Sequence, residues 1–311
     1  MNLAKPNYEM LKQEIDDMLS VHSHSGESPS VITATEASKM VFSSWKDSSP
    51  STKLPSWIEF NECTGGFRGR EFTILCGSTG SGKTEFLANI SSQLMHTKTP
   101  HVVWSVETGP VDFARRVYST LMGKDLNRGE GLSAELLKQV DEQHGDFFRS
   151  SSLSLFRYEN RIPSKILLCD LLYARKYLGA EIAMIDNLNF FLEVTTSAEQ
   201  IVEMDRVIHN IIIFCKQIDM HVIMVMHPKK TDHGRVESEF DIKGSSTAVQ
   251  EAHNVILFNR PSEEMLRMNS NLTKNCRELT FAKLRRRGNY AGRKIWFERE
   301  ECAYQEIGIQ S

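Results

Sequence analysis

The chain has 311 residues, 40% of them hydrophobic, and a formal net charge of −3 at pH 7. This length suits one large α/β domain with an appendage. The near-neutral charge excludes proteins that bind nucleic acid through a strong overall basicity, so such binding would need local basic patches. No apolar run approaches a membrane span, and the six cysteines include no C-x-x-C pair. We therefore expect no membrane partner, no zinc site and no disulfide framework.

The first 50 residues are predicted to form a helical linker. Residues 7–20 carry apolar side chains at helical spacing, and a second short helix is expected at 35–46. The segments 20–34 and 47–55 are rich in serine and proline and are predicted to be connecting segments. The first helix is either a frayed surface helix or a linker that packs on a neighbouring subunit. Residues 51–311 are predicted to form the main domain.

Strands alternate with helices from residue 56 onward. Strands are predicted at 71–77, 101–106, 182–186, 221–226, 253–259, 278–283 and 293–298. Helices are predicted at 83–96, 110–122, 133–143, 162–177, 197–218 and 246–251. This alternation predicts an α/β fold with a mainly parallel central sheet flanked by helices. The last two strands are joined by a short loop and are expected to form an antiparallel addition.

A complete phosphate-binding loop, G-x-x-x-x-G-K-[ST], follows the first of these strands. It consists of Gly77, Ser78, Thr79, Gly80, Ser81, Gly82, Lys83 and Thr84. The strand before it and the helix after it are the context in which this motif binds phosphates through backbone N–H groups. Lys83 is expected to reach the β- and γ-phosphates, and the Thr84 hydroxyl to hold Mg²⁺. The alternative, a glycine-rich turn before a helix, leaves the lysine and threonine unexplained. We therefore expect the chain to bind ATP or another nucleoside triphosphate together with Mg²⁺.

Three polar residues end later strands and are candidates for the chemistry at the phosphates. Glu107 could polarise the attacking water, or it could be a helix-capping acid. Asp186 suits the carboxylate that supports Mg²⁺. His227 could sense the γ-phosphate, or it could be a surface histidine at a strand end. These residues are expected to gather at one edge of the sheet.

A long charged segment follows His227. Long irregular loops in compact domains are usually functional or disordered. Its candidate contacts to a nucleic-acid backbone are Lys229, Lys230, Arg235, Lys243 and Gly244. The alternative is simple solvation of the charges. Gln250, shortly after the segment, is a candidate for linking it to the nucleotide.

The densest basic patch lies between residues 283 and 294. Strand alternation places Lys283 and Arg285 on the same face. Two cations aimed the same way, far in sequence from the phosphate loop, suit an arginine finger that stabilises the γ-phosphate, usually of a neighbouring subunit. The alternative is the basic rim of a hairpin.

Taken in order, these motifs resemble the RecA-type motor of hexameric replicative helicases of the DnaB-like family, and within it the helicase domain of Twinkle and of phage primase–helicases. The resemblance extends from about Trp57 to Phe297. Its distinguishing elements are Ile185-Asp186-Asn187, His227-Pro-Lys-Lys230 and Gly244-Ser-Ser…Gln250-Glu-Ala.

The resemblance implies a function and a set of roles. Glu107 is the implied catalytic base and His227 the γ-phosphate sensor. Arg285 is the implied finger donated in trans, with Lys283 as its companion. The 229–244 loop is implied to grip single-stranded DNA in the channel of a hexameric ring, with residues 1–50 closing the ring. Movement from 5′ to 3′ and unwinding of forked duplex DNA are implied by the resemblance alone.

The chain also departs from this pattern. No primase module precedes the motor in these 311 residues, so priming is expected to need a separate primase or polymerase. Arg286 stands where relatives carry an aromatic residue, and Tyr290 is the candidate replacement. The missing transit sequence favours a cytoplasmic setting of phage or bacterial type, or an organelle if the N-terminus has been removed.

Two other functions remain open from the sequence. One is a RecA-like ATPase that binds single strands in recombination or annealing without unwinding them. The other is an ATP-gated assembly protein without a nucleic-acid role, which the basic patch disfavours.

Overall fold

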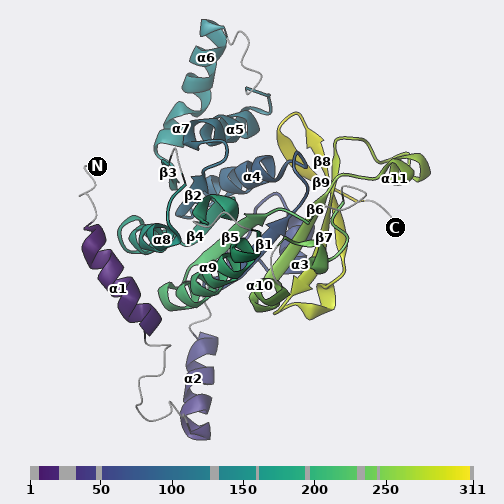
Figure 1. Ribbon diagram of the computed structural model, residues 1–311. Helices are drawn as coiled ribbons and strands as arrows, with labels where there is room; N and C mark the ends of the chain where they lie inside the picture. The colour runs from purple at the N-terminus through teal and green to yellow at the C-terminus, as the bar shows by residue number, and fades with distance from the viewer. Residues whose placement is uncertain are drawn as a thin grey trace.

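A single mixed sheet forms the centre of the molecule (Figure 1). The computed structural model describes residues 7–20, 33–46, 51–126, 133–158, 161–192, 197–229, 235–243 and 246–308. Within these residues the sheet has nine strands in the order β3-β2-β4-β5-β1-β6-β7-β8-β9. Their bounds are β1 Phe72–Cys76, β2 His101–Ser105, β3 Leu153–Phe156, β4 Ile182–Asp186, β5 His221–Met226, β6 Asn254–Asn259, β7 Cys276–Leu284, β8 Lys294–Glu300 and β9 Ala303–Ile307.

The first six strands in this order are parallel, and the last three are added antiparallel. β1 lies between β5 and β6, where Thr73 pairs with Ile223 on one side and Asn254 on the other. β7 pairs antiparallel with β6, and β8 and β9 continue the antiparallel part. The parallel strands β1, β2, β4, β5 and β6 are buried along their whole length, which is why they are continuous apolar runs in the sequence.

Helices cover both faces of the sheet (Figure 1). Their bounds are α1 Tyr8–Ser20, α2 Ala34–Lys46, α3 Ile58–Thr64, α4 Lys83–His96, α5 Pro110–Met122, α6 Ala134–Val140, α7 Asp146–Arg149, α8 Ser164–Leu178, α9 Ser197–Ile218, α10 Ser246–Glu251 and α11 Glu263–Met268. In the described residues no helix is both long and apolar enough to cross a membrane.

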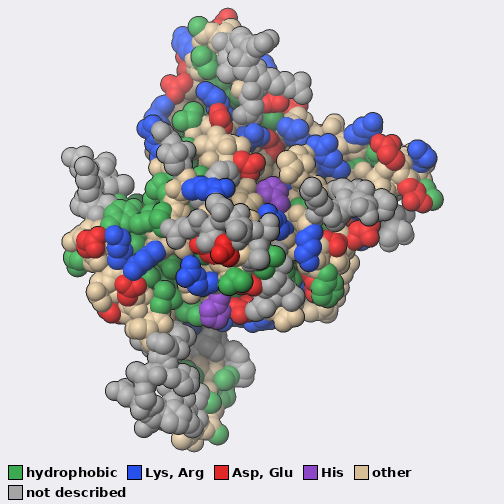
Figure 2. Space-filling view, in the orientation of Figure 1, with side chains coloured by type: hydrophobic (Ala, Val, Ile, Leu, Met, Phe, Trp, Pro, Cys, Tyr) green, Lys and Arg blue, Asp and Glu red, His purple; other side chains and the backbone are tan. Residues whose placement is uncertain are grey.

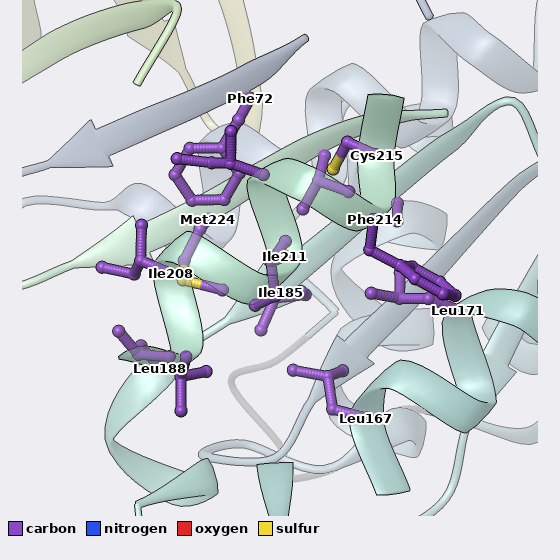
Figure 3. Close-up of a cluster of buried hydrophobic side chains, with 14 of the residues drawn as sticks. Phe72, Leu167, Leu171, Ile185, Leu188, Ile208, Ile211, Phe214, Cys215 and Met224 are labelled. Carbon is purple, nitrogen blue, oxygen red and sulfur yellow. The ribbon is translucent and has the colours of Figure 1, made fainter. Parts of the chain in front are cut away.

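Each face of the sheet has its own hydrophobic core, because successive strand side chains point to opposite faces. On β1, Phe72 and Ile74 join the core beneath α8 and α9, where Ile208 and Phe214 also lie (Figure 3). Leu75 joins the other core, beneath α3, α4 and α5. The strands that carry the candidate site are thereby fixed from both sides.

The predicted α/β class and the mainly parallel sheet are confirmed. Helices 83–96, 110–122, 197–218 and 246–251 and strands 182–186 and 221–226 have the predicted bounds. The sequence analysis missed β3, β9 and the short helices α3, α7 and α11. β3 has four half-buried residues within a serine-rich stretch, so its hydrophobic pattern is weak. The helix expected at 133–143 ends at Val140 and continues as a π-helical turn, Asp141–Gly145.

The N-terminal helix α1 packs against α8 and α9 of its own chain (Figure 1). Leu11 and Ile15 are buried there, so α1 is a packed element rather than a frayed one. The helix α2 extends away from the sheet and leaves Met40 and Phe42 each 59% exposed. Over the rest of the face seen in Figure 2, basic and acidic side chains are intermingled, in keeping with the small net charge.

Candidate active site

The carboxyl ends of four parallel strands bring the predicted site residues together. The phosphate loop follows β1, Glu107 comes two residues after β2, Asp186 ends β4, and His227 follows β5. Because β2, β4, β5 and β1 are consecutive in the sheet, these residues meet at one edge. They share a cavity of about 240 Å³, whose lining is Thr79, Gly80, Gly82, Lys83, Thr84, Glu85, Glu107, Arg116, Asp186 and His227.

The phosphate loop needs glycine where it turns into α4. Gly82 has φ +103°, a left-handed conformation, and caps the helix. A Cβ at this position would also lie 2.5 Å from the Tyr304 hydroxyl of β9. The turn directs the free N–H groups at the start of α4 toward the cavity, as anion binding requires.

Lys83 is buried at the base of the loop and folds back over it. Its Nζ donates hydrogen bonds to the Gly77 carbonyl at 2.6 Å and to the Ser78 carbonyl at 3.0 Å. Burial lowers the pKa of Lys83, and the nearby Asp186 partly offsets this effect. The ammonium group is therefore held beside the space that the loop encloses.

Thr84 and Asp186 supply two oxygen atoms suited to a hard cation. The Thr84 hydroxyl donates to Asp186 Oδ2 at 2.6 Å, and burial raises the pKa of Asp186. The described residues contain no group of three or more His, Cys, Asp or Glu side chains able to hold a metal ion. Mg²⁺ usually binds through one or two protein oxygens, water and substrate phosphates, so this donor set fits Mg²⁺ held together with a triphosphate.

Asn187 is a site residue that the sequence analysis did not select. Its Nδ2 donates to Glu107 Oε2 at 2.5 Å and lies 3.1 Å from His227 Nε2. The Glu107 carboxylate and the His227 ring are themselves 4.0 Å apart. Its signals in the sequence were its position directly after Asp186 and its place in the Ile185-Asp186-Asn187 element of the resemblance, neither of which gave it a role.

Two further contacts define the predicted base and its surroundings. Glu107 is not the N-cap of α5, because Gly109 holds that position and makes no side-chain capping hydrogen bond. Arg116 of α5 lines the cavity and pairs with the buried Glu85 of α4 at 2.7 Å. Arg116 was also missed, since nothing in the sequence links it to a residue 31 positions away.

A larger groove of about 1,100 Å³ adjoins the outer side of the phosphate loop. It is lined by the loop residues 78–81, the segment 259–265 that leads into α11, and the side chains of Arg235, Glu278 and Lys294. Arg260 reaches across it and donates to the Gly80 carbonyl. Thr79 and Gly80 line both the groove and the 240 Å³ cavity, so the two lie next to each other at the phosphate loop.

The predicted nucleic-acid segment begins at this edge of the sheet. Lys229 and Lys243 are exposed, and the Lys243 N–H donates to the His227 carbonyl at 3.0 Å. Arg235 differs from the expectation, because its guanidinium pairs with the buried Glu278 at 3.0 Å. Burying Glu278 requires a cation beside it, and Arg235 and Lys294 supply that charge. Lys230 and Gly244 lie outside the described residues.

Lys283 and Arg285 lie at the other end of the sheet, where the parallel strands begin. We call this end the amino edge and the end near the phosphate loop the carboxyl edge. β7 runs antiparallel to β6, so its nine residues carry the chain about 27 Å away from the end near the phosphate loop. There Lys283 Nζ donates to the Gln250 carbonyl at 2.5 Å, and Arg285 Nη2 donates to it at 3.1 Å. The predicted finger pair and Gln250 therefore lie together, at the C-terminus of α10, away from the phosphate loop of the same chain.

The residues after the finger pair also have partners. Arg286 forms an ion pair with the buried Glu71 at 2.8 Å. Tyr290 is contacted by the guanidinium groups of Arg287 and Arg293, at 5.6 and 5.7 Å from its ring centre. Tyr290 is therefore at the same edge as Arg285 and contributes no aromatic ring to the phosphate loop of its own chain.

Comparison with known proteins places these features in a family. The model of the DnaB-like helicase C-terminal domain matches residues 55–306. A solved structure of a DnaB-like replicative helicase and its interactions with primase superposes with a TM-score of 0.70 at 16% identity, over 96% of this chain and 76% of that one. A second solved structure, an ATPase domain, gives the same TM-score and identity, over 89% of this chain and 99% of that one. The structural likenesses support the fold, and the family match confirms the resemblance seen in the motifs.

Proposed function

The chain belongs to the family of DnaB-like helicase C-terminal domains, and from this premise we propose that it works as one subunit of a ring that moves along single-stranded DNA and separates forked duplex DNA. Hydrolysis of ATP by a replicative-type helicase follows from the family itself. The ring, the shared active site and the unwinding are the proposal.

One observation carries the proposal: the charged residues needed for phosphoryl transfer are divided between the two ends of the strands of the same sheet. Lys83, Glu107 and Asp186 lie at the carboxyl edge, whereas Lys283 and Arg285 lie at the amino edge. A rigid sheet between them keeps Arg285 from its own phosphate loop. A neighbour with its carboxyl edge against this amino edge would complete the site, and repetition of that heterologous contact gives a ring when the rotation between neighbours closes.

The residues at the carboxyl edge have complementary roles in this scheme. The loop N–H groups and Lys83 bind the β- and γ-phosphates, and Thr84 and Asp186 hold Mg²⁺. Mg²⁺ bound there neutralises charge on the phosphate oxygens. Glu107 orients the attacking water and accepts its proton. Arg285 of the adjacent subunit stabilises the charge that develops on the γ-phosphate.

The rest of the nucleotide is assigned to the 1,100 Å³ groove. It adjoins the phosphate cavity at Thr79 and Gly80, and it is large enough to take the groups attached to the triphosphate. The Arg260 guanidinium, which covers the loop at Gly80, is placed to contact the ribose or the base.

DNA contact is assigned to two exposed lysines of the segment that follows His227. Lys229 and Lys243 are exposed on it, and backbone contacts of this kind are independent of base sequence. Movement from 5′ to 3′ is carried over from the family resemblance. Since the solved DnaB-like relative interacts with primase, a separate primase is the first protein partner to test.

The docked helix α1 is assigned to the contact that links neighbouring subunits. A long connection joins α1 to the rest of the domain. The surface of α8 and α9 on which α1 packs would therefore fit the α1 of another subunit equally well. Exchange of α1 around the ring would add to the contact between sheet edges.

The proposal is tested by ATP-dependent displacement of a labelled strand from a forked duplex, with ATP hydrolysis measured in parallel. The native protein is expected to unwind the fork, and Arg285→Ala is expected to lose both activities. Arg267→Ala, on the exposed helix α11, is the control and should keep both. DNA-stimulated hydrolysis without displacement would contradict unwinding and favour an ATPase for recombination or annealing. Absence of salt-dependent DNA binding would favour an assembly ATPase.

A further inference from the structure

Asn187 occupies the point between the predicted catalytic base and the predicted phosphate sensor. It is buried, and its Oδ1 accepts a hydrogen bond from the Asn189 N–H at 3.1 Å. That contact sets the orientation of the amide and turns its NH₂ group toward Glu107 and His227. The two N–H bonds of this group match two acceptors, Glu107 Oε2 and His227 Nε2.

This arrangement requires one state of His227. Nε2 can accept a hydrogen bond only when it carries no proton, so the neutral ring holds its proton on Nδ1. Burial and the nearby Lys83 lower the pKa of His227 and favour the neutral form. Nδ1 is buried without a hydrogen-bond partner among the described residues, so the Asn187 contact is what orients the ring.

His227 is also joined by backbone contacts to described residues of the segment that follows it. Its carbonyl accepts the Lys243 N–H at 3.0 Å, and the adjacent Pro228 forms a β-bridge with Ile242. The Lys229 N–H donates to the Asp241 carbonyl at 2.6 Å. These backbone contacts at three consecutive residues connect Lys229 and Lys243 directly to His227.

We propose that Asn187 is a positioning residue that couples the setting of Glu107 to Lys229 and Lys243, the described ends of the segment that follows His227. DNA bound there moves His227, and His227 shifts the Asn187 amide. The amide in turn orients the Glu107 carboxylate, which accepts a proton from the water that attacks the γ-phosphate. The inference rests on the proposed function, since it requires DNA to bind at that segment.

Asparagine is suited to this role by its length and its donors. Aspartate has the same shape but donates no hydrogen bond, and it would add a negative charge beside Glu107 and Asp186. Leucine has a similar size and neither donors nor charge. Glutamine keeps both donors but displaces them by one methylene group.

The test measures ATP turnover with and without single-stranded oligothymidylate for the native protein, Asn187→Asp, Asn187→Leu and Asn187→Gln. Loss of the bond to Glu107 is expected to lower the DNA-stimulated kcat roughly tenfold or more, with little change in KM for ATP. The ratio of stimulated to basal turnover should fall in both N187D and N187L and recover in part in N187Q. Affinity for the oligonucleotide should stay within about twofold. Asn271→Leu, in the exposed turn before β7, is the control.

A spectroscopic readout separates coupling from a merely structural role. Nitrogen-15 NMR of the His227 ring should show an unprotonated Nε2 that accepts a hydrogen bond in the native protein and a changed signal in N187L, but not in N271L. An unchanged stimulation ratio in both N187D and N187L would overturn the inference while leaving the proposed function standing. If the native protein shows no DNA stimulation, the inference fails together with that function. Aspartate is isosteric with asparagine. If N187L does not fold, the stimulation ratio of N187D alone therefore tests whether Asn187 couples DNA binding to ATP turnover.

Discussion

At the residue scale, the polar groups of the carboxyl edge are held by one another. Lys83 is bonded to two loop carbonyls, Thr84 to Asp186, and Glu107 to Asn187. Buried polar groups are costly unless they are paired, so these bonds allow a charged cluster to sit beside a hydrophobic core. They also pre-orient the side chains, which lowers the cost of arranging them around phosphates.

The histidines His101 and His221 lead to a prediction about pH. Both are buried, and burial lowers the pKa of each to about 4. In the neutral state each ring donates from Nδ1 to a backbone carbonyl and accepts at Nε2 from a hydroxyl, Ser91 for His101 and Thr73 for His221. The pKa in the folded state lies below the unfolded value of about 6.5, so their contribution is complete above that pH and is lost as pH falls toward about 4.

The size of the loss can be measured by urea unfolding between pH 7 and pH 4.5. Each histidine is expected to account for about 2–3 kcal/mol of the decrease in the free energy of unfolding. His221→Gln keeps hydrogen-bonding capacity without the titrating proton, so its decrease should be smaller than in the native protein. An equal decrease in both proteins would contradict this assignment.

Which site residues were predictable depended on how local their signals are. The phosphate loop, Glu107, Asp186 and His227 follow strands directly, and strand ends of a parallel sheet converge at one edge. Arg260 and Arg116 gave no such signal, because Arg260 contacts the loop across 180 residues and Arg116 contacts Glu85 across 31. The ion pair of Arg235 with Glu278 was also not predictable, since it depends on how β7 packs beside β6.

At the scale of elements, the buried carboxylate of Asp170 fixes α1 to the sheet. It lies on α8 and accepts hydrogen bonds from Tyr8 of α1 at 2.7 Å, Tyr158 at 2.6 Å and Trp104 of β2 at 3.2 Å. Burial raises the pKa of Asp170, and the three donors offset part of that effect. One carboxylate thus joins the N-terminal helix to the strand that leads to Glu107.

The substitution Tyr8→Phe is expected to loosen α1 without unfolding the domain. It removes one of three donors to Asp170, a cost of about 1–2 kcal/mol, so amide hydrogen exchange over residues 8–20 should speed up roughly 5- to 30-fold. Exchange in β1 and β5 should not change. Lys12→Ala, which removes only an exposed ion pair with Glu9, is the control and should have little effect. Equal exchange rates in α1 of Tyr8→Phe and the native protein would show that Asp170 does not hold the helix.

Which elements were predictable also depended on how local their sequence signals are. The amphipathic pattern of residues 7–20 indicated a helix, and Leu11 and Ile15 form its buried face. The site on which the helix packs was not predictable, because its key contact joins Tyr8 to Asp170, 162 residues apart. β9 was missed for a related reason: it is a five-residue edge strand whose pattern is clear only once β8 lies beside it.

At the scale of the whole molecule, the sheet separates two halves of an active site. Its carboxyl edge holds the phosphate loop, and its amino edge holds Lys283 and Arg285 at the end of β7. A single chain therefore has both halves but cannot join them. Under the proposed function, catalysis is therefore a property of neighbouring chains, and hydrolysis at one interface is linked to the relative positions of two subunits.

The measurement that tests this shared site most directly is ATP hydrolysis by a mixture of Lys83→Ala and Arg285→Ala proteins that have been allowed to exchange subunits. Each variant alone is expected to be inactive. In mixed rings, a subunit with an intact Lys83 can receive Arg285 from its neighbour, so about a quarter of the interfaces should be complete and activity should return. If the mixture stays as inactive as its parts while both variants still assemble and bind ATP, the site is not shared between subunits and the central claim is wrong.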